Sequence, residues 1–145
     1  MKIAIGADHR GFAFKAYIKQ YVVGNGDPIV WIDAGADTDE RSDFPVFTKN
    51  VCELILSGEV DRGILICGSG IGMSIAANRH PKIYGALVWN KEAAQVSKEH
   101  NNANVLILPA DFISVEQAAQ MANSWLTAIF KKGRYQERID MIDLL

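Results

Sequence analysis

The 145-residue sequence has few cysteines, no long apolar run and no excess of charge of either sign. Its two cysteines, Cys52 and Cys67, lie far apart and outside any C-x-x-C pair, which favours two free thiols in a reduced, cytoplasmic protein. No apolar run approaches the ~20 residues that a membrane span requires, and Met1-Lys2-Ile3 enters an expected strand without the layout of a signal peptide. With a net charge of -2, the chain lacks the basic excess of a broad nucleic-acid surface. We therefore expect neither a membrane nor a nucleic acid as a partner.

Spacings typical of metal ligands are missing as well. There is no H-x-x-x-H pair, His80 and His100 stand alone, and the carboxylates do not cluster at ligand spacing. We expect chemistry without a metal or another cofactor. An apolar share of 49% in 145 residues is enough for one domain, residues 1–145, with its own core.

Short β-type runs alternate with helical stretches along the chain. The expected strands cover residues 2–7, 29–33, 62–67, 84–89 and 104–108. The expected helices cover residues 11–23, 44–57, 72–79, 91–100 and 114–131, followed by a final helix over 134–145. Ser114 and Gln117 fit a capping box for the helix over 114–131, and Gly133 fits its stop. This alternation predicts an α/β fold with a parallel sheet covered on both faces, whose ligands bind at the strand-to-helix turns.

The segment from Ile64 to Ser74 is the strongest sign of an active site. An apolar run ends in Cys67, and a turn with glycines at alternate positions then leads into a helix. Such a turn lets backbone N–H groups close around an anion, and a thiol near a helix N-terminus is expected to have a lowered pKa. The G-x-G-x-x-G motif of dinucleotide sites is not met, because Met73 stands where its last glycine would be. A tight turn alone would also use these glycines, but Cys67 and Ser69 favour a small-ligand site.

The first strand-to-helix turn carries three polar residues in succession, Asp8, His9 and Arg10. Asp8 alone would be explained as a helix cap. Three polar groups exceed what a cap requires. An Asp and a His exchange protons with sugar hydroxyls, and His9 or Arg10 meets an anionic group.

Three polar residues in the last third of the chain each allow two interpretations, one structural and one functional. His100 either caps the end of a helix, where the helix dipole favours it, or acts as a general acid or base. Arg134 and Arg138 lie four residues apart on one helix face, which suits a phosphate. They would equally form a solvated surface pair near Glu137 and Asp140. Spacing alone leaves these alternatives open.

Five motifs then occur in order along the chain. They are Ile5 to Phe12, Asp43-Phe44-Pro45, Cys67 to Asn78, Glu99 to Val105, and Gly133 to Arg138. Together they resemble the type B ribose-5-phosphate isomerases and their relatives, the subunits of galactose-6-phosphate isomerase. The similarity runs nearly end to end, and five motifs in register are far more specific than any one of them.

The resemblance implies a three-layer α/β/α sandwich with a five-stranded parallel, Rossmann-like sheet and a C-terminal helix. It implies a homodimer, sometimes paired into a tetramer, in which each active site is completed by the neighbouring subunit. The implied reaction is the cofactor-free interconversion of ribose 5-phosphate and ribulose 5-phosphate through an enediolate, a step of the pentose phosphate pathway.

The resemblance also implies a role for individual residues. Cys67 is the base that moves a proton between C1 and C2, and His100 with Asp8 assists opening of the furanose ring. The enediolate oxygen is stabilised by the turn made of Gly68, Ser69, Gly70, Ile71 and Gly72, with the Ser69 hydroxyl contributing. The remaining contacts are made by Asn101 to the sugar and by the groups matching phosphate-binding positions, His9, Arg134 and Arg138.

This chain departs from the family pattern in four places. Asp111 stands where the family usually has a phosphate-binding arginine, and it would repel phosphate unless it points away. Tyr84 also replaces an arginine, and Phe44 replaces a frequent tyrosine. Arg10 is normally a small residue, and we hypothesise that it restores the missing positive charge.

Two alternative functions remain open. One is an isomerase of a six-carbon sugar phosphate, such as allose or galactose 6-phosphate. The other is a sugar-phosphate-binding module without turnover, which Asp111 favours and the presence of both Cys67 and His100 disfavours.

Overall fold

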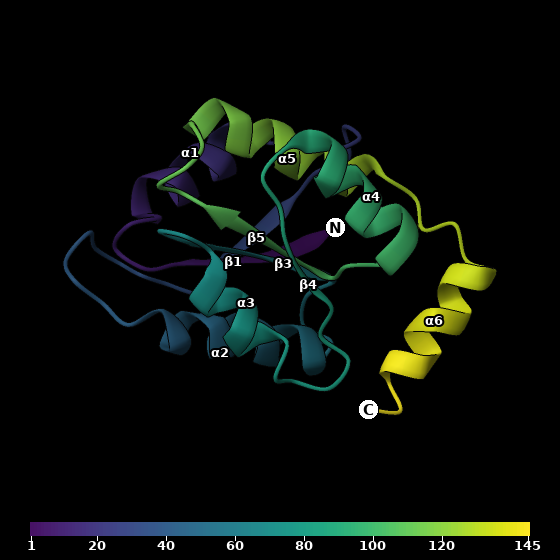
Figure 1. Cartoon of the computed structure of the whole chain (residues 1–145). Helices are drawn as coiled ribbons and strands as arrows, with labels where there is room; N and C mark the ends of the chain where they lie inside the picture. Colours follow the sequence, from purple (N-terminus) through teal and green to yellow (C-terminus); the bar gives the residue numbers. More distant parts are fainter.

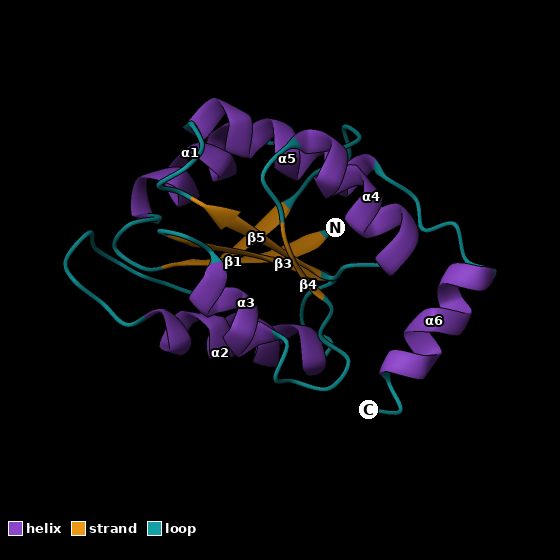
Figure 2. Cartoon of the chain, in the orientation of Figure 1, coloured by secondary structure: helices purple, strands orange, loops and turns teal.

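Five parallel strands form the centre of the molecule, in the order β2-β1-β3-β5-β4 (Figures 1 and 2). The computed structural model describes every residue from Met1 to Leu145. The strands are β1 (Lys2–Ala7), β2 (Val30–Asp33), β3 (Arg62–Cys67), β4 (Gly85–Leu87) and β5 (Val105–Pro109). The helices are α1 (Phe12–Tyr21), α2 (Phe44–Leu56), α3 (Ile71–Ala77), α4 (Lys91–Asn101), α5 (Val115–Thr127) and α6 (Arg134–Ile142).

Helices cover both faces of the sheet and make three layers. On one face α1, α4 and α5 enclose a core that includes Ile18 and Trp125 (Figure 1). On the other face α2 and α3 enclose a second core that includes Val51 and Met73. The three central strands are apolar and almost fully buried, as strands covered on both faces must be. The predicted three-layer α/β/α sandwich with five parallel strands is confirmed.

The segment after β5 differs most from its prediction. The capping box of Ser114 and Gln117 is present, with both of its hydrogen bonds. However, α5 ends at Thr127 and not at residue 131, because Ala128 is extended and the Lys131 N–H donates to the Glu99 carbonyl. Gly133 is not the stop of that helix. It has φ +56 and precedes the first turn of α6, which ends at Ile142.

Parallel strands give the sheet two different edges. We call the edge where the strands end the carboxyl edge, formed by Ala7, Asp33, Cys67, Leu87 and Pro109. We call the opposite edge, where they begin, the amino edge. The chain order changes direction between β1 and β3, so the turns that follow these two strands meet at the carboxyl edge. In contrast, α4 starts at the carboxyl edge and returns to the amino edge, where α6 lies beside it (Figure 1).

Candidate active site

Cys67 is the last residue of β3 and leads directly into the glycine turn. The residue is only 4% exposed, and the backbone N–H groups of Gly70 and Met73 lie near its sulfur and lower the pKa of the thiol. Gly70 has φ +74, and a Cβ there would lie 2.4 Å from the Leu87 side chain, so only glycine fits. The Ser69 hydroxyl accepts a hydrogen bond of 3.2 Å from the Ile71 N–H at the start of α3. The turn thus directs amide groups at the sulfur position.

The predicted lowering of the Cys67 pKa is wrong. Burial raises the pKa of this thiol more than the amides of Met73 and Gly70 lower it, and the carboxylates of Asp8 and Asp111 raise it further. A site near a helix N-terminus was the basis of the prediction. The thiol is instead enclosed by apolar side chains of the second core, where a charged sulfur is disfavoured.

The first turn leads from β1 into α1 and is hydrogen bonded to the loop before α2. Asp8 is 6% exposed, and its Oδ1 accepts hydrogen bonds from the N–H groups of Arg10 at 2.9 Å and Gly11 at 3.3 Å. Asp8 therefore stabilises the turn but does not cap the helix, because the N-cap of α1 is Gly11 and no side chain caps its first turn. The His9 N–H donates to the Ser42 hydroxyl, and His9 Nδ1 accepts from the Ser42 N–H at 3.3 Å. With Nδ1 accepting, Nε2 is the ring nitrogen left to meet a ligand.

Arg10 and Asp111 form an ion pair across two turns of the carboxyl edge. Arg10 Nη2 lies 2.7 Å and Nε 2.9 Å from Asp111 Oδ1. The pair covers Gly68, where a Cβ would be 2.8 Å from Asp111 Oδ2. Asp111 therefore faces the glycine turn and does not point away from it. The charge of Arg10 is matched by Asp111, so the pair adds no net positive charge to this edge.

Aromatic side chains form apolar walls beside this pair. The rings of Trp89 and Phe112 are 5.1 Å apart, and both residues are exposed at the carboxyl edge. The Phe44 ring covers Gly72, where a Cβ would lie only 2.5 Å from its Cζ. The carboxyl edge thus combines a thiol, backbone amides, a neutral ion pair and apolar walls.

The other predicted site residues lie at the amino edge. His100 and Asn101 form the end of α4, and the His100 ring stacks on Tyr135 of α6 with centroids 4.3 Å apart. Arg134 and Arg138 are exposed on α6, and neither belongs to an ion pair within the chain, although Glu137 and Asp140 lie on the same helix.

The two groups of predicted residues do not meet within one chain. In the pairing of β3 with β5, Gly63 is opposite Val105 and Cys67 is opposite Pro109. These four residues of strand separate the two edges by about 13 Å at ~3.3 Å per residue. The sequence already indicated this separation, because His100 lies shortly before the start of an expected strand and Cys67 lies at the end of one.

Two contacts of the site were missed by the sequence analysis. Ser42, which holds His9, gave no pattern of its own in the expected loop before α2. Tyr135, which stacks on His100, lies next to Arg134 in a quoted motif, and this adjacency was the available signal.

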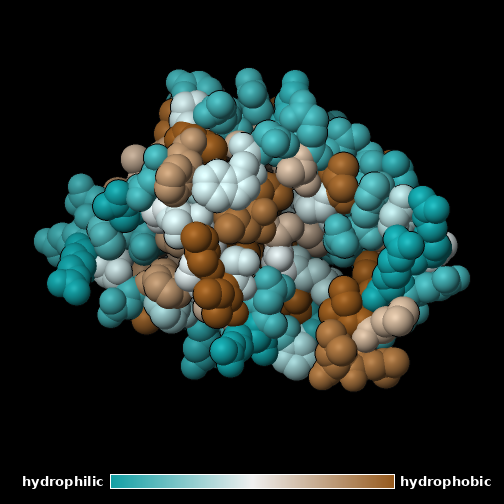
Figure 3. Space-filling view, in the orientation of Figure 1, coloured by the Kyte–Doolittle hydropathy of each residue, from teal (hydrophilic) through white to brown (hydrophobic).

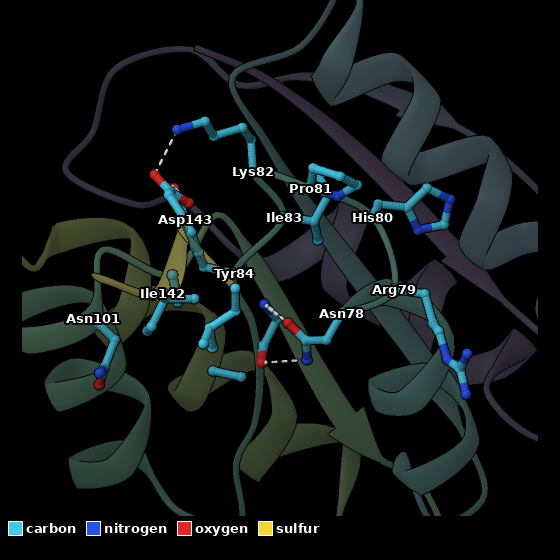
Figure 4. A pocket seen from close by; sticks show the side chains of 14 residues that line it. Asn78, Arg79, His80, Pro81, Lys82, Ile83, Tyr84, Asn101, Ile142 and Asp143 are labelled. Atoms are coloured by element: carbon cyan, nitrogen blue, oxygen red, sulfur yellow. Dashed lines mark hydrogen bonds and ion pairs between the residues drawn. The ribbon is translucent and has the colours of Figure 1, made fainter. Parts of the chain in front are cut away.

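A cavity of about 640 Å³ lies between α6 and the loop from α3 to β4 (Figure 4). Its lining includes Asn101, Tyr84 and Asp143, and it does not include Cys67. No three or more His, Cys, Asp or Glu side chains are grouped so as to hold a metal ion, and no helix has the length and apolarity to cross a membrane.

Comparison with known proteins assigns nearly the whole chain to one family model. The model is described as Ribose/Galactose Isomerase and matches residues 3–142. Ribose-5-phosphate isomerase B of Escherichia coli is 40% identical over 141 residues, which cover 97% of this chain and 93% of that protein. A putative sugar phosphate isomerase of Bacillus subtilis is 43% identical, over 98% of this chain and 95% of its own.

Solved structures agree with these sequence matches. A ribose 5-phosphate isomerase of Thermotoga maritima superimposes with a TM-score of 0.93 at 43% identity, covering 99% of this chain and 98% of its own. Ribose-5-phosphate isomerase B of Mycoplasma genitalium, solved with bound ribulose-5-phosphate, has a TM-score of 0.91 at 33% identity, covering 99% and 94%. The resemblance found in the five motifs is confirmed.

Proposed function

The chain belongs to the Ribose/Galactose Isomerase family and is an isomerase, and we propose that it interconverts ribose 5-phosphate and ribulose 5-phosphate. The relatives named for this reaction match over nearly their whole length, and one of them was solved with the ketose product. This pair of sugars belongs to the pentose phosphate pathway, and two free thiols fit the reducing cytoplasm.

The observation that carries the proposal is the setting of Cys67. Its sulfur meets the amides of Gly70 and Met73 at the end of a central strand, beside the polar first turn. Moving a proton along a sugar requires a base and a fixed set of donors for the negative oxygen that develops. A thiolate at this position is the base, and the glycine turn from Gly68 to Gly72 supplies the donors.

The proposed steps conserve every atom. The Cys67 thiolate takes the proton from C2 of the open aldose, the C–H electron pair forms a C1–C2 double bond, and the aldehyde oxygen becomes the enediolate oxygen. Backbone amides of the glycine turn and the Ser69 hydroxyl hydrogen bond to that oxygen. The hydroxyl proton passes from O2 to O1, the carbonyl forms at C2, and the Cys67 thiol returns its proton to C1.

The resting thiol must first lose its proton. Because burial raises the pKa of Cys67, most of the protein holds a neutral thiol at pH 7. The rate of isomerisation is therefore expected to rise with pH in proportion to the thiolate. Asp8 and Asp111 are the carboxylates that oppose this ionisation.

A second copy of the chain completes the proposed site. His100, Asn101, Arg134 and Arg138 cannot reach Cys67 of their own chain across the sheet, yet the family role assigns them to the same substrate. Apolar side chains are exposed near both groups: Ile71 and Ile75 on α3, and Met141, Ile142, Leu144 and Leu145 at the end of α6. In Figure 3 brown patches lie over α3 and over the C-terminal end of α6. Burial of these two patches favours a homodimer, alone or paired into a tetramer.

In this dimer the substrate bridges the two copies. Asp8 of one chain and His100 of the other open the furanose ring, and Asn101 contacts the sugar. The phosphate is bound by the unpaired Arg134 and Arg138, with His9 Nε2 on the opposite side. Anchoring the phosphate away from the reacting carbons lowers the entropic cost of orienting them.

Turnover of ribose 5-phosphate, allose 6-phosphate and galactose 6-phosphate tests the proposal. We expect the five-carbon substrate to have the highest kcat/KM, and Cys67→Ala to lower kcat by at least ~10³-fold. Cys52→Ala is the matched control, because Cys52 is equally buried but lies in the core beneath α2. A higher kcat/KM for a six-carbon sugar phosphate would contradict the proposed substrate. Binding of sugar phosphates without turnover would mean that the protein is a sugar-phosphate-binding module and not an enzyme.

Chemical modification gives an independent test of the Cys67 position. Iodoacetamide is expected to inactivate the protein faster at higher pH, and saturating ribose 5-phosphate is expected to slow this inactivation. Equal rates with and without substrate would place the reactive sulfur outside the binding site.

A further inference from the structure

α6 is attached to the rest of the chain mainly at its two ends. Among the helices and strands it packs chiefly against α4, and Ile139 is its only buried residue (Figure 1). A nine-residue helix with one buried side chain has little packing to set its direction. Within one chain, its orientation therefore depends on a small number of polar contacts.

The first attachment lies at the N-terminal end of α6. The Lys131 N–H donates to the Glu99 carbonyl at 3.0 Å, and Lys131 Nζ lies 2.7 Å from the Glu99 carboxylate. Tyr135 stacks on His100, as described above. Contacts at this end alone would fix the position of the first turn of α6 but not the direction of the helix axis.

The second attachment is Asp143, the residue that follows α6. Its Oδ1 accepts a hydrogen bond of 2.7 Å from the Tyr84 hydroxyl, and its Oδ2 lies 2.5 Å from Lys82 Nζ (Figure 4). The Asp143 side chain is 17% exposed, while the following Leu144 and Leu145 are fully in solvent. A carboxylate at a helix C-terminus is disfavoured by the helix dipole, so stabilisation of α6 itself does not explain an aspartate at this position.

The body side of this contact is itself rigid. Asn104 accepts a hydrogen bond of 2.8 Å from the Tyr84 N–H and donates one of 2.8 Å to the Lys82 carbonyl. Lys82 has φ +67, a backbone conformation that L-residues adopt only when the surroundings hold them there. Burial, together with Asp143, raises the pKa of Tyr84 to about 12, so its hydroxyl stays a donor at neutral pH.

We propose that Asp143 is a positioning residue: through Lys82 and Tyr84 it fixes the direction of α6. The guanidinium group of Arg138, which lies between the two attachments, is thereby held ready for the substrate phosphate, a consequence that rests on the proposed function. At 1.5 Å per residue, Arg138 lies about 4.5 Å along the axis from Tyr135, and its long side chain extends the lever further. A tilt of α6 by ~10° about Tyr135 moves such a side chain by about 1 Å, enough to weaken a charge-assisted hydrogen bond.

We call the contacts of Asp143 with Lys82 and Tyr84 the clamp. Steady-state kinetics of the full chain with ribose 5-phosphate tests it. Asp143→Asn is expected to raise KM about 5- to 10-fold with kcat within about twofold, because phosphate binding and not proton transfer is affected. Tyr84→Phe, which removes one donor and leaves Lys82, is expected to raise KM about 2- to 3-fold. Glu53→Gln is the control, because it removes an exposed Lys49–Glu53 pair on α2 and should leave KM unchanged.

A double variant separates positioning from loss of folding. If Asp143 acts through Arg138, the Arg138→Ala/Asp143→Asn protein has the KM of Arg138→Ala alone. Additive effects on KM, or a fall of kcat at constant KM, would overturn the proposal. Unfolding midpoint and molecular mass in solution, measured for each variant, identify any that simply fails to fold or assemble.

Amide hydrogen exchange tests the clamp without any substrate. The N–H groups of residues 134–142 are expected to exchange at least ~10-fold faster in Asp143→Asn than in the unmodified chain or in Glu53→Gln. Unchanged exchange overturns the clamp. Faster exchange in a protein that does not isomerise ribose 5-phosphate would support the clamp and refute the proposed function, so the two failures are distinguishable.

Discussion

At the carboxyl edge of the sheet, the charged side chains of the candidate site have partners within the chain, whereas the two arginines at the amino edge have no ion-pair partner. The Asp8 carboxylate accepts hydrogen bonds from backbone N–H groups of its own turn, and Arg10 forms an ion pair with Asp111. Arg134 and Arg138 stand on a helix held mainly at its ends. The charged groups of the carboxyl edge are therefore paired within one chain, and the amino edge keeps two arginines for the phosphate and the second copy that we propose.

The largest expected effect tests whether the two edges work in different chains. Cys67→Ala and His100→Ala are each expected to lower kcat by at least ~10³-fold. After the two proteins are mixed and subunits exchange, a symmetric dimer with shared sites should recover about a quarter of the unmodified activity. Recovery arises because half of the dimers then contain one site with both residues intact. No recovery despite demonstrated exchange would mean that each site uses one chain.

The next largest effects distinguish Arg138, which has no ion-pair partner, from Arg10, which is paired with Asp111. Arg138→Ala should raise KM for ribose 5-phosphate about 10- to 50-fold, since it removes charge-assisted hydrogen bonds. Arg10→Ala should raise KM about 5-fold, because it leaves the Asp111 carboxylate unneutralised beside the glycine turn. Arg10→Ala/Asp111→Asn should restore KM to within about twofold of the unmodified protein. If Arg10→Ala leaves KM unchanged, the hypothesis that Arg10 compensates for Asp111 is wrong.

Stability should also differ between the edges. Lys15 of α1 is 4% exposed, lies 2.7 Å from Asp33 at the end of β2, and also donates to the Ala36 carbonyl. Lys15→Met should lower the free energy of unfolding by about 2–4 kcal/mol, because it leaves these acceptors without their buried donor. At the amino edge, Lys131→Met removes a lysine that is 53% exposed from its pair with Glu99, and it should change denaturant unfolding far less than Lys15→Met does. Equal losses would contradict the view that the buried lysine of the carboxyl edge stabilises the fold more than the exposed lysine of the amino edge.

The smallest effect concerns the pH dependence of kcat. In the proposed mechanism only the thiolate of Cys67 is active, and the pKa of this thiol is raised, so kcat should increase with pH up to a plateau above the ordinary thiol range. The Asp111 carboxylate is one cause of the raised pKa, so Asp111→Asn should move this rise to lower pH. The pH–rate profile of Glu53→Gln serves as control, because that carboxylate does not act on Cys67. A shift of the Asp111→Asn profile to higher pH would contradict the assignment.

Local patterns predicted most elements because they depend on neighbours in the chain. Apolar runs predicted β1, β3 and β5 within one residue of their ends, and Ser114 with Gln117 predicted the start of α5. The end of α5 was missed because Lys131 is held by Glu99, a contact across 32 positions of chain that no local pattern reports.

The sequence proposes residues for the candidate site, whose roles stay predictions, but it does not give their arrangement. The glycine turn, the first-turn polar residues and the arginine pair are visible in the sequence, and with the five motifs they identified the family. Residue types and order alone determined this much, since spacing on a strand or helix is set by backbone geometry.

Only the tertiary structure decided how these residues meet. Arg10 and Asp111 are 101 positions apart, and their pairing depends on which turns adjoin in the sheet. The raised pKa of Cys67 depends on burial in the second core and on the carboxylates of Asp8 and Asp111, and the distance of His100 from Cys67 depends on the path of α4. Burial and charge interaction act through space, so they are settled by the packing of segments that the sequence keeps far apart.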